Sequence, residues 1–193
     1  MTKLWYAGIG SRETPPAYLG MMQSIGCELG KTGWGLRSGA AKGADTAFEI
    51  GCSTVMGIKQ IFYAGDIGVN QLTQAPNGDY RGSVAVCKLV ARAVHPNGRN
   101  LSPQALELHA RNTYQLLGPD LNTPVKFVVC YCTKDDKGHY MGGTGQALRM
   151  ALLLNIPIMN LADYNPTDKE VLLGHIRHVS RFHTEVLKEE DFK

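Results

Sequence analysis

The sequence predicts a single α/β domain in which a mainly parallel sheet carries helices on both faces, the doubly wound, Rossmann-like arrangement. Strand-like and helix-like apolar patterns alternate over most of the chain, which is typical of parallel sheets with right-handed crossovers. The near-continuous apolar run 125–132 fits a central strand that is buried on both faces. Glycine-rich segments follow several of the expected strands, as they do where helices begin directly at strand ends.

The first half of the chain contains three expected strands with two helices between them. Residues 3–8 form a short β-prone run, and two prolines then open a helical pattern over about 16–30. A second strand, 34–38, leads through glycines into a helix of small and apolar residues that starts at 45. Residues 59–64 are expected to form the third strand.

The second half begins with a long polar stretch, 65–81, of a kind that is usually functional or an insertion. Ser102 is expected to cap a helix that has Pro103 at its first position. The helices expected here are 83–94, 103–117, 146–154 and 167–190. After the central strand, residues 156–161 supply the last strand. One domain is therefore expected over residues 1–193, with its core at about 3–162 and a C-terminal helix at about 167–190.

Composition narrows the class of protein. The 193 residues are 44% hydrophobic and 19% charged, enough for a buried core. The apolar runs are shorter than the roughly 20 residues of a membrane-spanning helix, and the N-terminus lacks a signal-peptide pattern. We therefore expect a cytoplasmic protein without a membrane partner. The five cysteines lack zinc-ligand spacing, so no metal site is expected.

The strongest functional signal comes from three glycine-rich segments, at residues 8–12, 38–45 and 142–145. A strand that turns directly into a helix aims unpaired N–H groups and the positive end of the helix dipole at the carboxyl edge of the sheet. Glycines let the backbone approach an anion closely. Neither G-x-G-x-x-G nor the P-loop pattern is present, which disfavours an ordinary NAD site and ATP hydrolysis. The sequence predicts a composite phosphate site, and no cofactor is expected.

The motifs in these segments resemble a known superfamily. They are Gly10-Ser11-Arg12, Arg37-Ser38-Gly39-Ala40-Ala41-Lys42-Gly43-Ala44-Asp45, Arg111-Asn112 and Gly142-Gly143-Thr144-Gly145-Gln146-Ala147. Their order is similar to that in the SLOG superfamily, which includes the DNA-processing protein DprA/Smf, the Lonely guy (LOG) phosphoribohydrolases and the YspA-like nucleotide-binding proteins. The resemblance covers about residues 4–161 and implies a Rossmann-like fold with a pocket at the carboxyl edge.

Phosphate chemistry and the resemblance together select the candidate ligand-binding residues. Arg12 and Arg37 lie where a guanidinium could clamp a phosphate through two hydrogen bonds. Asp45 could cap its helix, shape the pocket or do both. Only the resemblance places Arg111 and Asn112 beside the pocket. The full candidate set is Gly10, Ser11, Arg12, Arg37, Ser38, Gly39, Lys42, Asp45, Arg111, Asn112, Gly142, Gly143, Thr144, Gly145 and Gln146.

Three functions remain open. The first is binding of a nucleotide-derived small molecule, either ADP-ribose-like, cyclic or a mononucleotide, for sensing or sequestration. The second is DprA-like binding of single-stranded DNA, against which the net charge of only +3 argues. The third is LOG-like N-glycosidase activity, but the position of the LOG catalytic glutamate is Arg149. No catalytic residue is assigned, the prediction leans away from an enzyme, and association into a homo-oligomer is left open.

Overall fold

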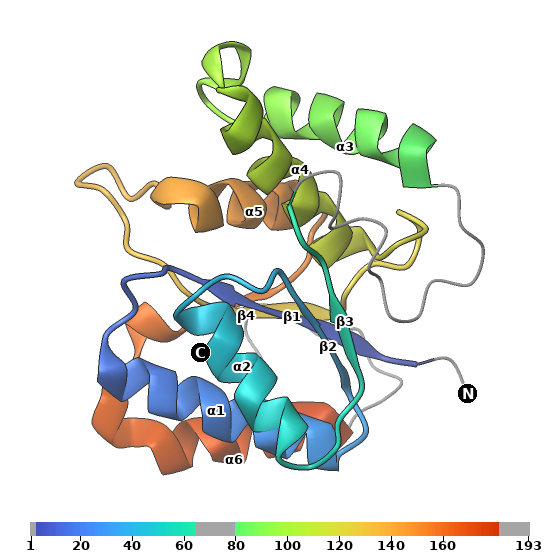
Figure 1. Cartoon of the computed structure of the whole chain (residues 1–193). Coiled ribbons are helices and arrows are strands. Elements are labelled where there is room, and N and C mark those ends of the chain that lie inside the picture. Colours follow the sequence, from blue (N-terminus) through green and yellow to red (C-terminus); the bar gives the residue numbers. More distant parts are fainter. Residues whose placement is uncertain (1–2, 65–79, 182–193) are drawn as a thin grey trace.

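The computed structural model describes residues 3–64 and 80–181, which form one five-stranded parallel sheet (Figure 1). The strand order is β3-β2-β1-β4-β5, and every neighbouring pair is parallel. The strands are β1 (Trp5–Gly10), β2 (Gly35–Ser38), β3 (Lys59–Ile61), β4 (Phe127–Tyr131) and β5 (Ile158–Asn160). From β1 the chain continues outward to β2 and β3, and later returns to the other side of β1 as β4. The expected parallel α/β sheet is confirmed.

Helices cover both faces of the sheet (Figure 1). One layer contains α1 (Pro16–Lys31), α2 (Ala44–Ser53) and α6 (Lys169–Arg181). The other contains α3 (Tyr80–Val94), α4 (Pro103–Leu117) and α5 (Gly142–Leu153). Short 3₁₀ turns span Gly98–Asn100, Leu161–Asp163 and Pro166–Asp168. None of the helices in residues 3–64 and 80–181 is long and apolar enough to cross a membrane.

The central strand β1 is buried because its alternate side chains enter two different cores. Tyr6 faces α1 and α2, and its ring stacks on Phe127 with centroids 5.8 Å apart. Trp5 and Ala7 face the other layer, where they pack with α5. A strand buried on both faces reads as a continuous apolar run, which is why β1 and β4 were recognisable from the sequence.

Several helix boundaries differ from the expected ones; α3, for example, begins at Tyr80 rather than at residue 83. The helix α5 begins at Gly142 rather than at residue 146, so its glycines form the first helical turn instead of a preceding loop. Glycine disfavours helices intrinsically, but packing of this turn on α4 outweighs that preference. The helix α6 ends at Arg181 in the structure, and the rest of the expected helix, 182–190, lies outside the described residues. The same holds for most of the polar stretch, 65–79.

The helices α1 and α2 pack with their backbones close together, and glycines permit this. A Cβ atom added at Gly26 would lie 2.6 Å from the carbonyl oxygen of Phe48 and 3.1 Å from the amide of Cys52. A Cβ atom at Gly51 would lie 2.0 Å from the carbonyl oxygen of Gln23. Backbone atoms cannot move aside as a flexible side chain can, so the contact requires glycine.

Replacing Gly26 with alanine is therefore expected to lower the free energy of unfolding by about 2 to 3 kcal/mol, the cost of overpacking a tight contact. Gly20 provides a matched control in the same helix, because a Cβ atom there meets nothing within 4 Å. Gly20→Ala should raise the free energy of unfolding by about 0.5 to 1 kcal/mol through helix propensity. Urea denaturation of both variants measures the difference, and equal effects would contradict the close helix contact.

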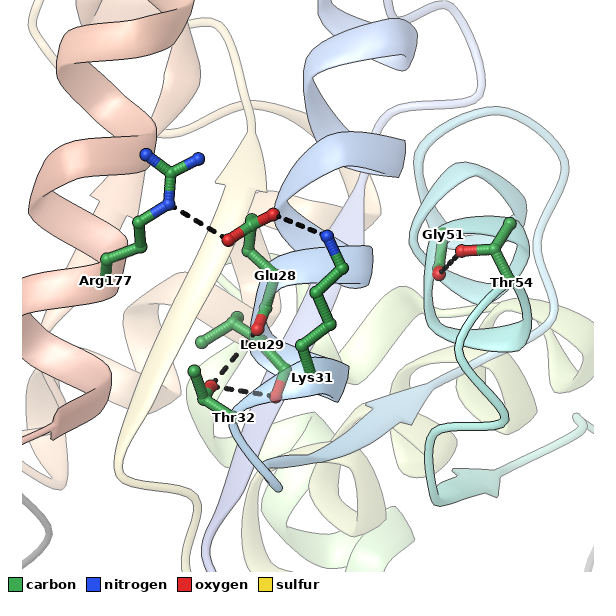
Figure 2. A network of polar contacts seen from close by, with 7 residues as sticks. All are labelled: Glu28, Leu29, Lys31, Thr32, Gly51, Thr54 and Arg177. Atoms are coloured by element: carbon green, nitrogen blue, oxygen red, sulfur yellow. Dashed lines mark hydrogen bonds and ion pairs between the residues drawn. The ribbon is translucent and has the colours of Figure 1, made fainter.

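A polar cluster links α6 to α1 on the outside of this layer. Figure 2 shows Glu28 between two cations: Arg177 of α6 donates from Nε to Oε2 at 3.0 Å, and Lys31 donates from Nζ to Oε1 at 3.0 Å. The hydrogen bond from Arg177, followed by that from Lys31, lowers the pKa of Glu28. Because the cluster is largely solvated, it orients α6 more than it stabilises the fold.

Candidate functional site

A cavity of about 570 Å³ opens at the carboxyl ends of β1 and β4. Here the chain order reverses, since β1 is followed on one side by β2 and on the other by β4. Crevices at such switch points are the usual ligand sites of open α/β sheets. The volume lies in the range of small-molecule sites.

Four segments that are distant in sequence build the wall. They are the end of β1 with the following turn, the start of α2, one face of α4, and the residues from the end of β4 into α5. Most of the candidate residues are brought together in this wall, namely Gly10, Ser11, Arg12, Asp45, Arg111, Asn112, Gly142, Gly143 and Thr144. The remaining candidates, Arg37, Ser38, Gly39, Lys42, Gly145 and Gln146, are not among its lining residues.

The first turn of α5 presents uncapped backbone N–H groups to the cavity. Its N-cap residue is Met141, whose side chain makes no capping hydrogen bond, and the turn contains no acidic residue. Gly142 has a φ of +64°, a conformation that favours glycine. The first amides of a helix have no intrahelical acceptor and carry the positive end of its dipole. The amides of Gly142, Gly143 and Thr144 are therefore suited to an anion.

A pair of opposite charges, the buried Asp45 and the half-buried Arg111, lines the same cavity. Both side chains contact Gly39: its N–H donates to Asp45 Oδ2 at 3.0 Å, and its carbonyl accepts from Arg111 Nη1 at 2.7 Å. Burial raises the pKa of Asp45 to about 6, while Arg111 and the amides of Gly39 and Ala41 act in the opposite direction. Burial also lowers the pKa of Arg111, partly offset by Asp45.

Two donors in the wall lack partners. Arg111 Nε and Gln115 Nε2 are buried and make no hydrogen bond to the described residues, although both side chains line the cavity. Gln115 is only 1% exposed. Both atoms face Gly39, because a Cβ atom added there would lie 2.7 Å from Arg111 Nε and 2.8 Å from Gln115 Nε2. They are therefore covered by the wall and are not presented to a ligand in the cavity.

Asn112 couples α4 to the first turn of α5. Its Nδ2 donates to Gln146 Oε1 at 2.9 Å and to the carbonyl of Gly143 at 3.2 Å. Gln146 does not line the cavity itself, but its side-chain carbonyl holds Asn112 in place. Gly145 also lies outside the lining. It allows the first turn of α5 to pack closely on Tyr140, because a Cβ atom at Gly145 would lie 2.3 Å from the carbonyl oxygen of Tyr140.

Arg37 lies away from the cavity and is 1% exposed. Its Nε donates to Gln60 Oε1 at 2.8 Å, its Nη1 donates to the carbonyl of Thr123, and the guanidinium lies 4.9 Å from the ring centroid of Trp5. Burial lowers the pKa of Arg37 to about 10. These contacts describe a structural arginine that holds the connection between α4 and β4.

The other candidates beside the loop after β2 have different surroundings. Ser38 Oγ donates to Glu49 Oε1 within the α2 layer. Gly39 contributes only its backbone, as described above. Lys42 is exposed and follows Ala41, which lines the cavity.

Sequence reasoning did not select His109, Gln115, Cys132 and Thr133, which also line the cavity. Burial, followed by the neighbouring His95, lowers the pKa of His109 to about 4, so His109 is neutral at pH 7. Helical periodicity was the available signal for His109 and Gln115, because each lies three residues from Asn112 on one face of α4. Thr133 and Cys132 follow a strand without any distinguishing motif.

The position of the LOG glutamate lies outside the cavity wall. Arg149, at the position of the LOG glutamate, donates from Nη1 to the carbonyl of Tyr140 at 3.0 Å and does not line the cavity. The carboxylates that do line it are Glu13, which is exposed, and Asp45. Within the described ranges, no three His, Cys, Asp or Glu side chains are grouped to hold a metal ion.

No protein-family model matches the chain, and no curated protein matches it either. Among solved structures, the chain is similar to the X-ray structure of DNA processing protein A (DprA) from Streptococcus pneumoniae, with a TM-score of 0.51 and 14% identity. The chain has a DprA-like fold. The similarity covers 98% of this chain and 60% of that one, so the chain spans about three fifths of that protein. Membership of the wider SLOG superfamily stays a prediction.

Proposed function

We propose that the protein binds a phosphate-bearing, nucleotide-derived small molecule in the cavity beside β1 and β4. The observation that carries the proposal is that helix N-terminal amides and an arginine from distant segments line one cavity. The uncapped first turn of α5 contributes the amides, and Arg111 of α4 contributes a guanidinium. Acceptor-rich anions are the ligands that such a set favours.

The wall also has an apolar side. Ala105 and Leu108 of α4 line the cavity together with Met141, which is half exposed. With phosphate at the first turn of α5, a base or sugar would lie against these side chains. Mixed walls of this kind, with a few convergent polar groups, are usual for small-molecule sites. Binding for sensing or sequestration requires no further chemistry from the chain.

Nucleoside 5′-phosphates are expected to stabilise the fold, whereas the matching nucleosides are not, because the donors serve the phosphate. A ligand at about 100 times its Kd adds about 2.7 kcal/mol of stability, which raises the Tm of a chain of this size by about 5 to 10 °C. Differential scanning fluorimetry with all four common bases, at constant ionic strength, measures the shift. Equal shifts from nucleosides and nucleotides would contradict a phosphate site.

A second candidate function is binding of single-stranded DNA, which the DprA-like fold supports. Arg12 and Lys42 are exposed near the cavity opening and could contact neighbouring phosphates. Binding to a strand weakens with salt at a slope of about −0.7 per contacted phosphate. A salt series with a short oligonucleotide separates the two functions: the nucleotide pocket predicts a slope no steeper than about −2, and a steeper slope lost in the Arg12→Ala/Lys42→Ala variant would favour DNA.

A further inference from the structure

The juxtaposition of Asp45 and Arg111 across Gly39 in the cavity wall has a consequence for ligand charge. We infer that the cavity selects phosphate groups that carry one negative charge, as in phosphodiesters, over terminal phosphates that carry two. This inference rests on the proposed function and names the class of phosphate that the site takes.

Among the described residues, the charged side chains that line the cavity balance. They are two cations, Arg12 and Arg111, and two anions, Glu13 and Asp45, while Lys42 lies outside the lining and is exposed to solvent. His109 is neutral at pH 7 because burial lowers its pKa. The positive potential for an anion therefore comes mainly from unpaired N–H groups, above all those at the start of α5. A helix terminus is equivalent to about half an elementary charge. Its attraction grows in proportion to the charge of the phosphate, whereas the desolvation cost of the phosphate grows faster, which favours one negative charge over two.

Asp45 is fixed in the wall and cannot turn away from a ligand. It is 2% exposed, lies in the first turn of α2, and accepts the Gly39 N–H at 3.0 Å. Repulsion between like charges is strong where water is excluded. A second negative charge on a bound phosphate would therefore be opposed by the Asp45 carboxylate, whereas Arg12 and Glu13 are exposed and more screened.

The groups that act on Asp45 come from each surrounding element. Arg111 of α4 favours the ionised form, Glu49 of α2 opposes it, and the backbone of Gly39 and Ala41 favours it. Arg12, from the turn after β1, acts on Arg111. Because burial raises the pKa of Asp45 to about 6, its carboxylate is ionised at pH 8 and mostly protonated at pH 5. A phosphomonoester also gains its proton near pH 6, so the discrimination should be largest at pH 8.

The test compares 5′-nucleotides of the four common bases with their phosphate methyl esters, which keep the base and sugar but carry one negative charge. Calorimetry at pH 8 should give a Kd about tenfold lower for the methyl ester, which corresponds to about 1.4 kcal/mol. In Asp45→Asn the ratio should fall to about threefold or less, because monoester binding tightens. Glu170→Gln provides a matched loss of charge on α6, on the opposite face of the sheet from α4 and α5, and should keep the tenfold ratio.

A second measurement uses the wild-type chain and does not depend on the variant folding. Between pH 8 and pH 5.5 the ratio should shrink, and binding of the monoester at pH 7 should take up more protons than binding of the ester. Equal affinities at pH 8, or a ratio that does not change with pH, would overturn the inference and leave the proposed function standing. Failure of both ligands to bind would overturn the proposed function, and this inference with it.

Discussion

Replacing Arg37 with alanine is expected to lower the free energy of unfolding by about 3 kcal/mol or more, with little effect on nucleotide binding. The side chain is 1% exposed and packs against Trp5. Its removal leaves a cavity and deprives the Thr123 carbonyl and Gln60 Oε1 of their donor. Loss of the packing of this buried side chain costs about 2–5 kcal/mol, and the two half-buried acceptors left without a donor add to that cost.

Urea denaturation measures this loss, and Arg12→Ala provides the matched control. Arg12 is exposed, so its removal should change the free energy of unfolding by no more than about 0.5 kcal/mol while weakening nucleotide binding. The opposite pattern, in which Arg37→Ala keeps its stability and loses binding, would return Arg37 to the site. The two arginines thus separate a structural role from a ligand contact by two independent readouts.

The fold was predictable because short stretches of sequence indicate each strand and helix without knowledge of distant contacts. The strands β1 and β4 read as apolar runs, and prolines or glycines mark where helices begin or end. Parallel strands share one carboxyl edge, so the glycine segments after β1, β2 and β4 had to meet there. Helix ends were less certain, as at α5, where tertiary contacts make helix from glycines that favour a loop.

The candidate site was only partly predictable, because contacts between distant residues decide which side chains face the cavity. Arg37 is adjacent to the glycine segment in sequence, yet its acceptors come from Gln60 and from Thr123, 86 residues away. The side chain of Arg37 also points to the opposite face of the sheet from that of Ser38, since neighbouring side chains on a strand alternate between faces. No local motif reports these facts. The same limit hid Thr133, which lines the cavity only because β4 lies beside β1.

Placing a carboxylate in the first turn of α5 should separate anion binding from helix stability. Thr144 is the third residue of the helix and lines the cavity. Glutamate is favourable at this helix position, where it interacts with the dipole and the N-terminal amides. The variant Thr144→Glu should therefore keep or raise the free energy of unfolding. Its carboxylate would occupy the positive potential that the ligand phosphate needs and repel the phosphate at close range.

We expect the Kd for nucleoside phosphates to rise about 100-fold in Thr144→Glu, which corresponds to about 2.7 kcal/mol. Thr144→Gln has nearly the same shape without the charge, so it should change the Kd far less. Calorimetric titration combined with thermal unfolding measures both quantities on the same samples. The difference between the two variants at equal stability isolates the effect of charge from that of side-chain size. If Thr144→Glu binds nucleotides as well as Thr144→Gln does, the phosphate does not lie at the first turn of α5.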